Sequence, residues 1–123
     1  MKNILEIDNN HESITRLVMN DEKTGNSLSN EMISRMKEAI EEIAQDRYMK
    51  VVIIAAKGNI FCAGHNLKEM TEARNNSDKG RNYFEKLFNS CSELMQSIVN
   101  CPIPVIAEID GIATAAGCQL VAS

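Results

Sequence analysis

Two short apolar runs separated by a helical pattern place the strongest constraint on the fold of this chain. Residues 51–56 read V-V-I-I-A-A and residues 105–109 read V-I-A-E-I. Short apolar runs bounded by turn residues favour strands buried on both faces, and such strands pair in parallel when helices connect them. Between the two runs, apolar side chains over residues 84–99 recur at the spacing of one helix face. The sequence therefore predicts an α/β fold with a parallel sheet and helical cover.

The N-terminal segment predicts a β-hairpin. Residues 4–8 and 14–19 both alternate between apolar and polar side chains, and the turn-forming residues 9–12 lie between them. His11 falls in that turn, where we expect it to be a solvated loop residue.

Three further segments predict helices. Ser29 is a suitable N-cap for a helix whose apolar positions run over residues 32–44. A short helix is expected over residues 67–73. A last helix, rich in small residues, is expected over residues 113–122, and residues 74–79 are expected to form a polar surface loop.

Length and charge narrow the class of protein. A chain of 123 residues forms at most one domain, and its 44% hydrophobic and 24% charged residues are typical of globular proteins. The formal net charge of −4 argues against a general nucleic-acid binder. No apolar run approaches the roughly 20 residues that span a bilayer, so no membrane partner is expected. Residues 1–8 carry early acids and no apolar core, unlike a secretory signal, and predict a cytoplasmic protein.

The four cysteines do not form a metal or redox motif. Cys62, Cys91, Cys101 and Cys118 lie ten or more residues apart, whereas zinc sites and redox pairs favour short spacings. We expect them to be reduced and to pack as small hydrophobic residues. No metal site is predicted.

The turn after the first apolar run is a candidate binding site. The chain must turn sharply around Gly64, which has no Cβ and lets a ligand approach the main chain. The N–H groups that follow would lie at a helix N-terminus, where a partial negative charge is stabilised.

Four sequence blocks carry a resemblance to a known family. Residues 61–70, F-C-A-G-H-N-L-K-E-M, resemble the F-C-A-G-A-D-L-K-E-M signature of the crotonase (enoyl-CoA hydratase/isomerase) superfamily. N-S-L-S at residues 26–29 is similar to the family's N-A-L-S, and P-V-I-A occurs at residues 104–107. Residues 111–120, G-I-A-T-A-A-G-C-Q-L, stand where the family has G-x-A-x-G-G-G-x-E-L. This last variant is typical of one subgroup of the superfamily.

The resemblance implies a fold, a partner and an assembly. The crotonase (ClpP-like) fold is a spiral of β-β-α units with C-terminal helices that build trimers, and its members are much longer than this chain. Residues 1–123 are therefore expected to be the N-terminal half of one such domain, ending inside a helix. The expected partner is an acyl-CoA thioester, with coenzyme A as part of the substrate and no other cofactor. A homotrimer or hexamer is expected for the full-length protein.

The resemblance also assigns residues. Two backbone donors, the N–H groups of His65 and Ala116, would stabilise an enolate oxygen on the thioester. The His65 side chain would either act as an acid or base, or lie passively against the ligand. Ala115 and Ala116 add Cβ atoms where the family has Gly, which would narrow the pocket or require different backbone angles. The residues expected to line the substrate are Ser27, Ala63, His65, Asn66, Leu67, Lys68 and Ala116.

Gln119 is the main departure from the family pattern. Hydratases have a Glu here that positions and activates water, whereas Gln can hold a water but cannot transfer a proton. The first hypothesis is an acyl-CoA enzyme of this family, in which hydration itself is in doubt. The second is a non-catalytic acyl-CoA binder or regulatory homologue, and the third is a plain structural α/β domain.

Overall fold

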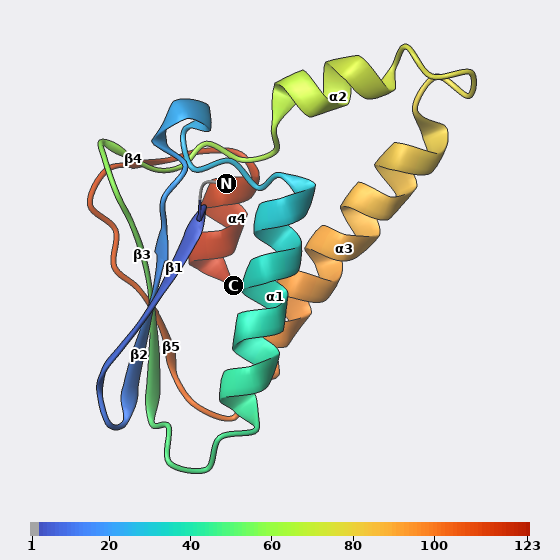
Figure 1. Ribbon diagram of the computed structural model, residues 1–123. Coiled ribbons are helices and arrows are strands. Elements are labelled where there is room, and N and C mark those ends of the chain that lie inside the picture. Colours follow the sequence, from blue (N-terminus) through green and yellow to red (C-terminus); the bar gives the residue numbers. More distant parts are fainter. Residues whose placement is uncertain (1–2) are drawn as a thin grey trace.

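The computed structural model describes residues 3–123 (Figure 1). Met1 and Lys2, on which the cytoplasmic prediction partly rested, lie outside the described residues. The elements in chain order are β1 (Leu5–His11), β2 (Ile14–Met19), η1 (Glu22–Thr24), α1 (Asn30–Ala44), β3 (Val51–Ala56), β4 (Ile60–Cys62), α2 (Leu67–Ala73), α3 (Arg81–Val99), β5 (Val105–Ala107), β6 (Ile112–Ala113) and α4 (Ala116–Ala122).

The main sheet has four strands in the order β1-β2-β3-β5. β1 and β2 form the antiparallel hairpin, while β2 with β3 and β3 with β5 are parallel pairs. The parallel register joins Val52 to Thr15 on one side and to Val105 on the other. The predicted hairpin and the predicted parallel pairing are both confirmed.

A second, two-stranded sheet pairs β4 with β6 in parallel. Neither strand was predicted, and the last helix begins at Ala116 rather than at residue 113 because residues 112–113 form β6. β5 likewise ends at Ala107, two residues before its apolar run ends. In the hairpin, β1 continues to His11, so the turn is shorter than predicted and His11 ends a strand, although its side chain is exposed.

The elements repeat a β-β-α order. The units β3-β4-α3, in which the short α2 precedes α3, and β5-β6-α4 each place their first strand in the main sheet and their second strand in the small sheet. In the N-terminal unit, the segment around Leu28 takes the place of the second strand, since Leu28 forms a parallel bridge to His65. Successive units therefore lay their second segments side by side, which brings distant parts of the sequence together.

The core lies between the sheet and the helices. α1, α3 and α4 all lie on one side of the main sheet (Figure 1). Ser29 caps α1 as predicted, because its side chain accepts a hydrogen bond from the N–H of Met32 at 3.1 Å. The largest fully buried side chains come from β1 to β4, from the segment before α1, and from α1 and α3: Phe61, Leu5, Leu17, Met19, Leu28, Met32, Ile33, Met36, Ile40, Leu87, Leu94 and Val52.

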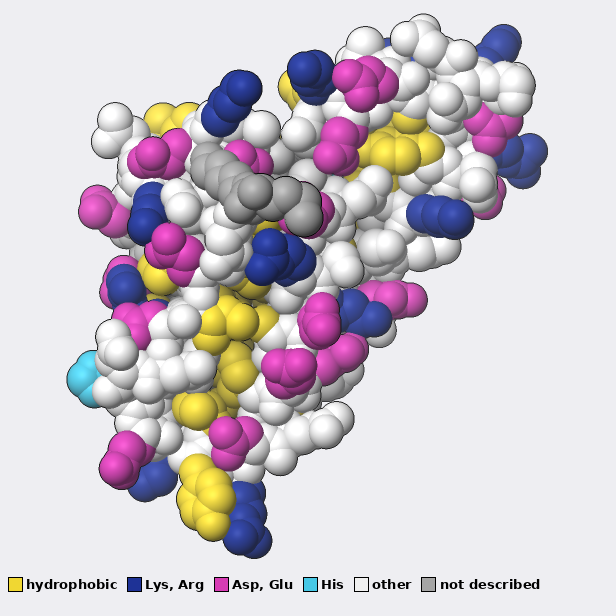
Figure 2. All heavy atoms as spheres, viewed as in Figure 1, with side chains coloured by type: hydrophobic (Ala, Val, Ile, Leu, Met, Phe, Trp, Pro, Cys, Tyr) yellow, Lys and Arg dark blue, Asp and Glu magenta, His cyan; other side chains and the backbone are white. Residues whose placement is uncertain are grey.

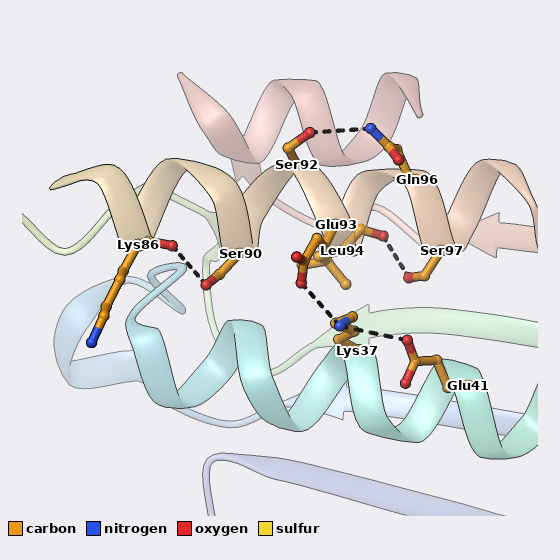
Figure 3. A network of polar contacts seen from close by, with 9 residues as sticks. All are labelled: Lys37, Glu41, Lys86, Ser90, Ser92, Glu93, Leu94, Gln96 and Ser97. Atoms are coloured by element: carbon orange, nitrogen blue, oxygen red, sulfur yellow. Dashed lines mark hydrogen bonds and ion pairs between the residues drawn. The ribbon is translucent and has the colours of Figure 1, made fainter. Parts of the chain in front are cut away.

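A polar link joins α1 to α3 at the surface. Lys37 on α1 contacts Glu93 on α3 at 3.0 Å and Glu41 on its own helix at 3.6 Å (Figure 3). The hydrogen bond with Glu93, together with the charge of Glu41, raises the pKa of Lys37. Because these side chains are partly exposed, the link orients the two helices more than it stabilises them.

α2 and the first turns of α3 project away from the body of the molecule (Figure 1). The view in Figure 2 shows basic side chains interspersed with acidic ones rather than gathered in one patch. Over residues 3–123, no helix combines the length and the apolar character needed to cross a bilayer.

Candidate functional site

Three of the sequence blocks meet at the small sheet. The N–H of Leu28 donates to the carbonyl of Gly64 at 2.7 Å, so the block at residues 26–29 runs beside the signature turn around Gly64. The N–H of Thr114 donates to the carbonyl of Cys62 at 3.0 Å, which brings the block at residues 111–120 to the other side of the same turn. Segments more than 85 residues apart in the sequence, from Leu28 to Thr114, thus converge on Gly64.

Two backbone donors without an acceptor in the described residues lie at this turn. Gly64 has φ of +94°, and a Cβ placed on it would lie 3.2 Å from the backbone nitrogen of Ala116. Ala116 is the first residue of α4, where an N–H has no acceptor within its own helix. Among the backbone hydrogen bonds of residues 3–123, none has the N–H of His65 or of Ala116 as its donor. Both groups are therefore free to bind an oxygen outside the chain.

Ala115 has a backbone conformation that is uncommon for a residue with a side chain. Its φ is 51° and its ψ is −125°, and it directly precedes the Ala116 donor. Such a conformation costs on the order of 1–3 kcal/mol for a non-glycine residue. Of the two alanines expected to narrow the pocket or to require different backbone angles, Ala115 carries strain, whereas Ala116 lies at the start of a helix and is not among the residues with positive φ.

Replacing Ala115 with Gly is expected to raise the free energy of unfolding by about 1 kcal/mol. The free energy gained by relieving the strained backbone exceeds the free-energy cost of the extra conformational entropy that Gly gives the unfolded chain. Denaturant titration of the complete protein measures the change. Ala122→Gly, on the exposed side of α4, is the matched control and should lower stability by about 1 kcal/mol. Destabilisation by both variants to the same extent would contradict the strain at Ala115.

The side chains of His65 and Gln119 face one hollow. This hollow has a volume of about 410 Å³ and opens between the signature turn, α3 and α4. Its lining residues are His65, Phe88, Cys91, Ser92, Met95, Gln96, Val99 and Gln119. The structure thus brings together the two side chains that the sequence singled out for chemistry. The α3 residues were predicted only as a core-facing helix stripe, and Phe88 is instead 51% exposed.

The remaining predicted substrate residues occupy different environments. Asn66 caps α2, since its side-chain oxygen accepts from the N–H groups of Lys68 and Glu69 at 3.0 and 3.2 Å. Leu67 is 74% exposed, and Lys68 beside it is also exposed, so both are available to a ligand. Ser27 is 2% exposed, and its hydroxyl lies 3.0 Å from that of Thr24.

Ala63 holds the turn through its main chain. Its N–H donates to the carbonyl of Gly25 at 3.0 Å, and its carbonyl accepts from the hydroxyl of Thr114 at 3.3 Å. The neighbouring Cys62 is buried, and that burial raises the pKa of its thiol. Among residues 3–123, no three His, Cys, Asp or Glu side chains gather in a way that could hold a metal ion.

Comparison with known structures defines the class of protein. The crystal structure of human enoyl Coenzyme A hydratase domain-containing protein 3 matches 98% of this chain with a TM-score of 0.87 and 38% identity. An enoyl-CoA hydratase from Mycobacterium smegmatis matches 98% of the chain with a TM-score of 0.89 and 43% identity. The chain therefore has the mixed α/β crotonase fold, over a region that corresponds to 45% of each of those two chains.

Sequence comparison then assigns the family. The profile of the enoyl-CoA hydratase/isomerase family matches residues 9–123. The chain belongs to the enoyl-CoA hydratase/isomerase family. Enoyl-CoA hydratase domain-containing protein 3 of Xenopus laevis is 46% identical over 110 residues, and the human protein of that name is 43% identical over 112 residues. The variant block at residues 113–120 resembles this same group.

The curated relatives add two facts. The alignments cover 89% and 91% of this chain but 36% and 35% of the Xenopus laevis and human relatives, so the chain spans about a third of their length. Both relatives are named as mitochondrial. The cytoplasmic prediction is therefore wrong. It rested on the composition of residues 1–8, and that composition does not indicate the mitochondrial location that the names of these relatives give.

Proposed function

We propose that this chain carries the oxyanion site of an acyl-CoA enzyme, in which the N–H groups of His65 and Ala116 stabilise a thioester enolate. The observation that carries the proposal is the pair of unengaged backbone donors beside Gly64. Preorganised donors aimed at a developing oxyanion are among the strongest contributions to such chemistry. Because both donors belong to the main chain, the histidine and alanine side chains do not prevent this role.

The substrate would be an acyl-CoA thioester, with no cofactor beyond its coenzyme A. Its CoA portion would lie against Ala63, Asn66, Leu67 and Lys68. Leu67 and Lys68 are exposed at the start of α2, and Ala63 and Asn66 before that helix are partly exposed, which supports this placement. Ser27 would contribute only indirectly, because it is 2% exposed and both its N–H and its hydroxyl already pair with the hydroxyl of Thr24. For the complete protein, a homotrimer or hexamer is the expected assembly.

A second candidate function is non-catalytic binding of acyl-CoA. Gln119 favours it, because an amide at this edge of the hollow holds water or substrate but transfers no proton. Both candidates share the oxyanion site and differ only in whether a proton is transferred there.

Turnover of crotonyl-CoA by the complete protein, followed by loss of enoyl absorbance, separates these functions. Wild-type hydration at ordinary enzyme rates shows that Gln119 is tolerated. Activity only in Gln119→Glu shows an intact pocket that lacks native hydration. If neither protein is active, titration with acetyl-CoA decides: tight binding supports the binder or another reaction, and absent binding contradicts the acyl-CoA proposal.

The oxyanion role itself is tested by Ala116→Pro. Proline is tolerated at the first position of a helix, yet it removes the N–H that would bind the oxyanion. Losing one such donor is expected to lower kcat by about 10²–10³-fold. Turnover of whichever acyl-CoA is converted, or affinity for acetyl-CoA if none is, should fall. Because proline also restricts the backbone of the preceding Ala115, which has a positive φ, the melting temperature is measured alongside to establish that the variant is folded. Unchanged turnover and affinity in a folded variant would contradict the proposed oxyanion site.

A further inference from the structure

The His65 ring is held by packing rather than by hydrogen bonds. It meets Phe88 edge-on, with ring centroids 5.8 Å apart and an interplanar angle of 66°. Phe88 in turn stacks on Phe84 one turn earlier in α3, at 6.1 Å and 22°. The Nδ1 atom of His65 is buried and has no hydrogen-bond partner among the described residues. A histidine with a purely structural role would have this nitrogen paired, because an unpaired buried polar atom is costly.

The chemistry of the hollow leaves one group suited to moving a proton. Of the eight lining residues, only His65 and Cys91 have ionisable side chains. Burial raises the pKa of the Cys91 thiol, which keeps it protonated. Gln119 and Gln96 are amides, which bind but do not ionise. Imidazole is the side-chain type that commonly serves as a general acid or base.

We propose that the imidazole of His65 is the proton-transfer group of this site and takes the part that Gln119 cannot perform. This inference rests on the proposed function, since it requires a thioester at the neighbouring N–H groups. One residue then serves twice: its N–H binds the thioester oxygen, and its side chain acts on the carbon atoms beside that carbonyl. Phe88 is a positioning residue, because its edge-on contact fixes the ring.

In the hydration direction, a water held by Gln119 gives a proton to the imidazole as the oxygen of that water bonds to the β-carbon of an enoyl thioester. The π electrons between the α- and β-carbons form the carbon–carbon double bond of the enolate, and the π electrons of the carbonyl move onto the thioester oxygen between the two N–H groups. As the enolate collapses, the imidazolium gives the proton to the α-carbon. One water has been added across the double bond, and His65 is neutral again.

The same group should exchange the α-protons of a saturated thioester. Removal of an α-proton by the imidazole generates the enolate, and return of a deuteron from D₂O labels the α-carbon. Deuterium uptake into butyryl-CoA, read by mass spectrometry, therefore reports His65 without requiring hydration.

The test compares wild type with His65→Ala in the complete protein. Alanine keeps the backbone N–H and is the residue that the resembled signature carries at this position. We expect hydration of crotonyl-CoA and deuterium uptake into butyryl-CoA to fall by about 10²–10⁴-fold. The Kd for butyryl-CoA should stay within about threefold, and added imidazole should restore part of the lost rate. His65→Gln is the second variant if His65→Ala is poorly folded, and Gln96→Ala, which changes the same hollow, is the matched control.

Each outcome distinguishes the two proposals. Unchanged rates in folded His65→Ala overturn the role of the imidazole, and if Ala116→Pro is still impaired, the oxyanion site stands. A wild type that binds butyryl-CoA but neither hydrates nor exchanges also overturns the imidazole role and favours the binder. If wild type does not bind the thioester at all, both proposals fail. A lost rate in His65→Ala that imidazole cannot restore, accompanied by weaker binding, assigns His65 to packing instead.

Discussion

Gly117→Ala is expected to lower the free energy of unfolding by about 3 kcal/mol, because α4 leaves no room for a methyl group where it meets β4. A Cβ on Gly117 would overlap the carbonyl oxygen of Cys62 and lie 2.7 Å from its carbonyl carbon. Both obstacles are backbone atoms, so they cannot swing away as a flexible side chain would. Alanine is favoured over glycine in a helix by about 1 kcal/mol, which is too little to offset the clash.

The same substitution should weaken the proposed oxyanion site. Relief of the clash requires α4 to move away from β4, and Ala116 moves with it, away from Gly64. Denaturant titration of the complete protein measures the stability, and acetyl-CoA titration measures the binding. Ala122→Ser, on the exposed side of α4, should change stability by no more than about 0.5 kcal/mol. An unchanged midpoint for Gly117→Ala would contradict the close packing of α4 on β4.

The parts of the fold that followed from the sequence are those encoded by local patterns. The run over β3 is long enough to indicate a buried strand, and Ser29 before an amphipathic stretch indicates a helix start, because both signals are complete within a few residues. β4 and β6 could not be predicted in this way. They have three and two residues, which is too few to show a period. They form because the repeated β-β-α units place them side by side.

In the candidate site as well, features marked by sequence motifs were predicted, and features set by backbone geometry were not. His65 and Gln119 came from motif positions, and the structure places both at one hollow. The free N–H of Ala116 and the strain at Ala115 depend on backbone angles, which residue identity alone does not specify. Phe88 was missed because helical spacing assigns it to a buried stripe, and no local signal shows that this stripe continues past the core into the hollow.

Asn26, in the block at residues 26–29, has a structural role that the resemblance alone did not explain. Asn26 is 0% exposed and has φ of 51°, a conformation that asparagine tolerates better than most residues. Its side-chain oxygen accepts from the N–H of Asp21 at 2.7 Å. Its side-chain nitrogen donates to the carbonyls of Lys57 and Ile60 at 2.9 and 2.8 Å. One buried amide thus joins the loop before α1 to the connection between β3 and β4.

Asn26→Ala is therefore expected to destabilise the protein by about 4 kcal/mol, since each buried backbone group left without its partner costs about 1–3 kcal/mol. The loss should reach the site as well, because Ile60 begins the strand that leads to Gly64. Urea titration of the complete protein gives the stability, and acetyl-CoA titration gives the effect on binding.

Three comparison variants separate backbone strain from lost hydrogen bonds as causes of this destabilisation. Asn26→Gly tolerates the positive φ but lacks the amide, so any stability it regains over Asn26→Ala reports relief of backbone strain, less the entropy that Gly adds to the unfolded chain. Asn26→Asp keeps the acceptor for Asp21 but loses both donors and sets a negative charge against two carbonyl oxygens, so it should be no better than alanine. Asn10→Ala, at an exposed position, should change stability by no more than about 0.5 kcal/mol. If Asn26→Asp were as stable as wild type, the two donated hydrogen bonds would not hold the loop, and the position of His65 would have to depend on the β4–β6 pairing instead.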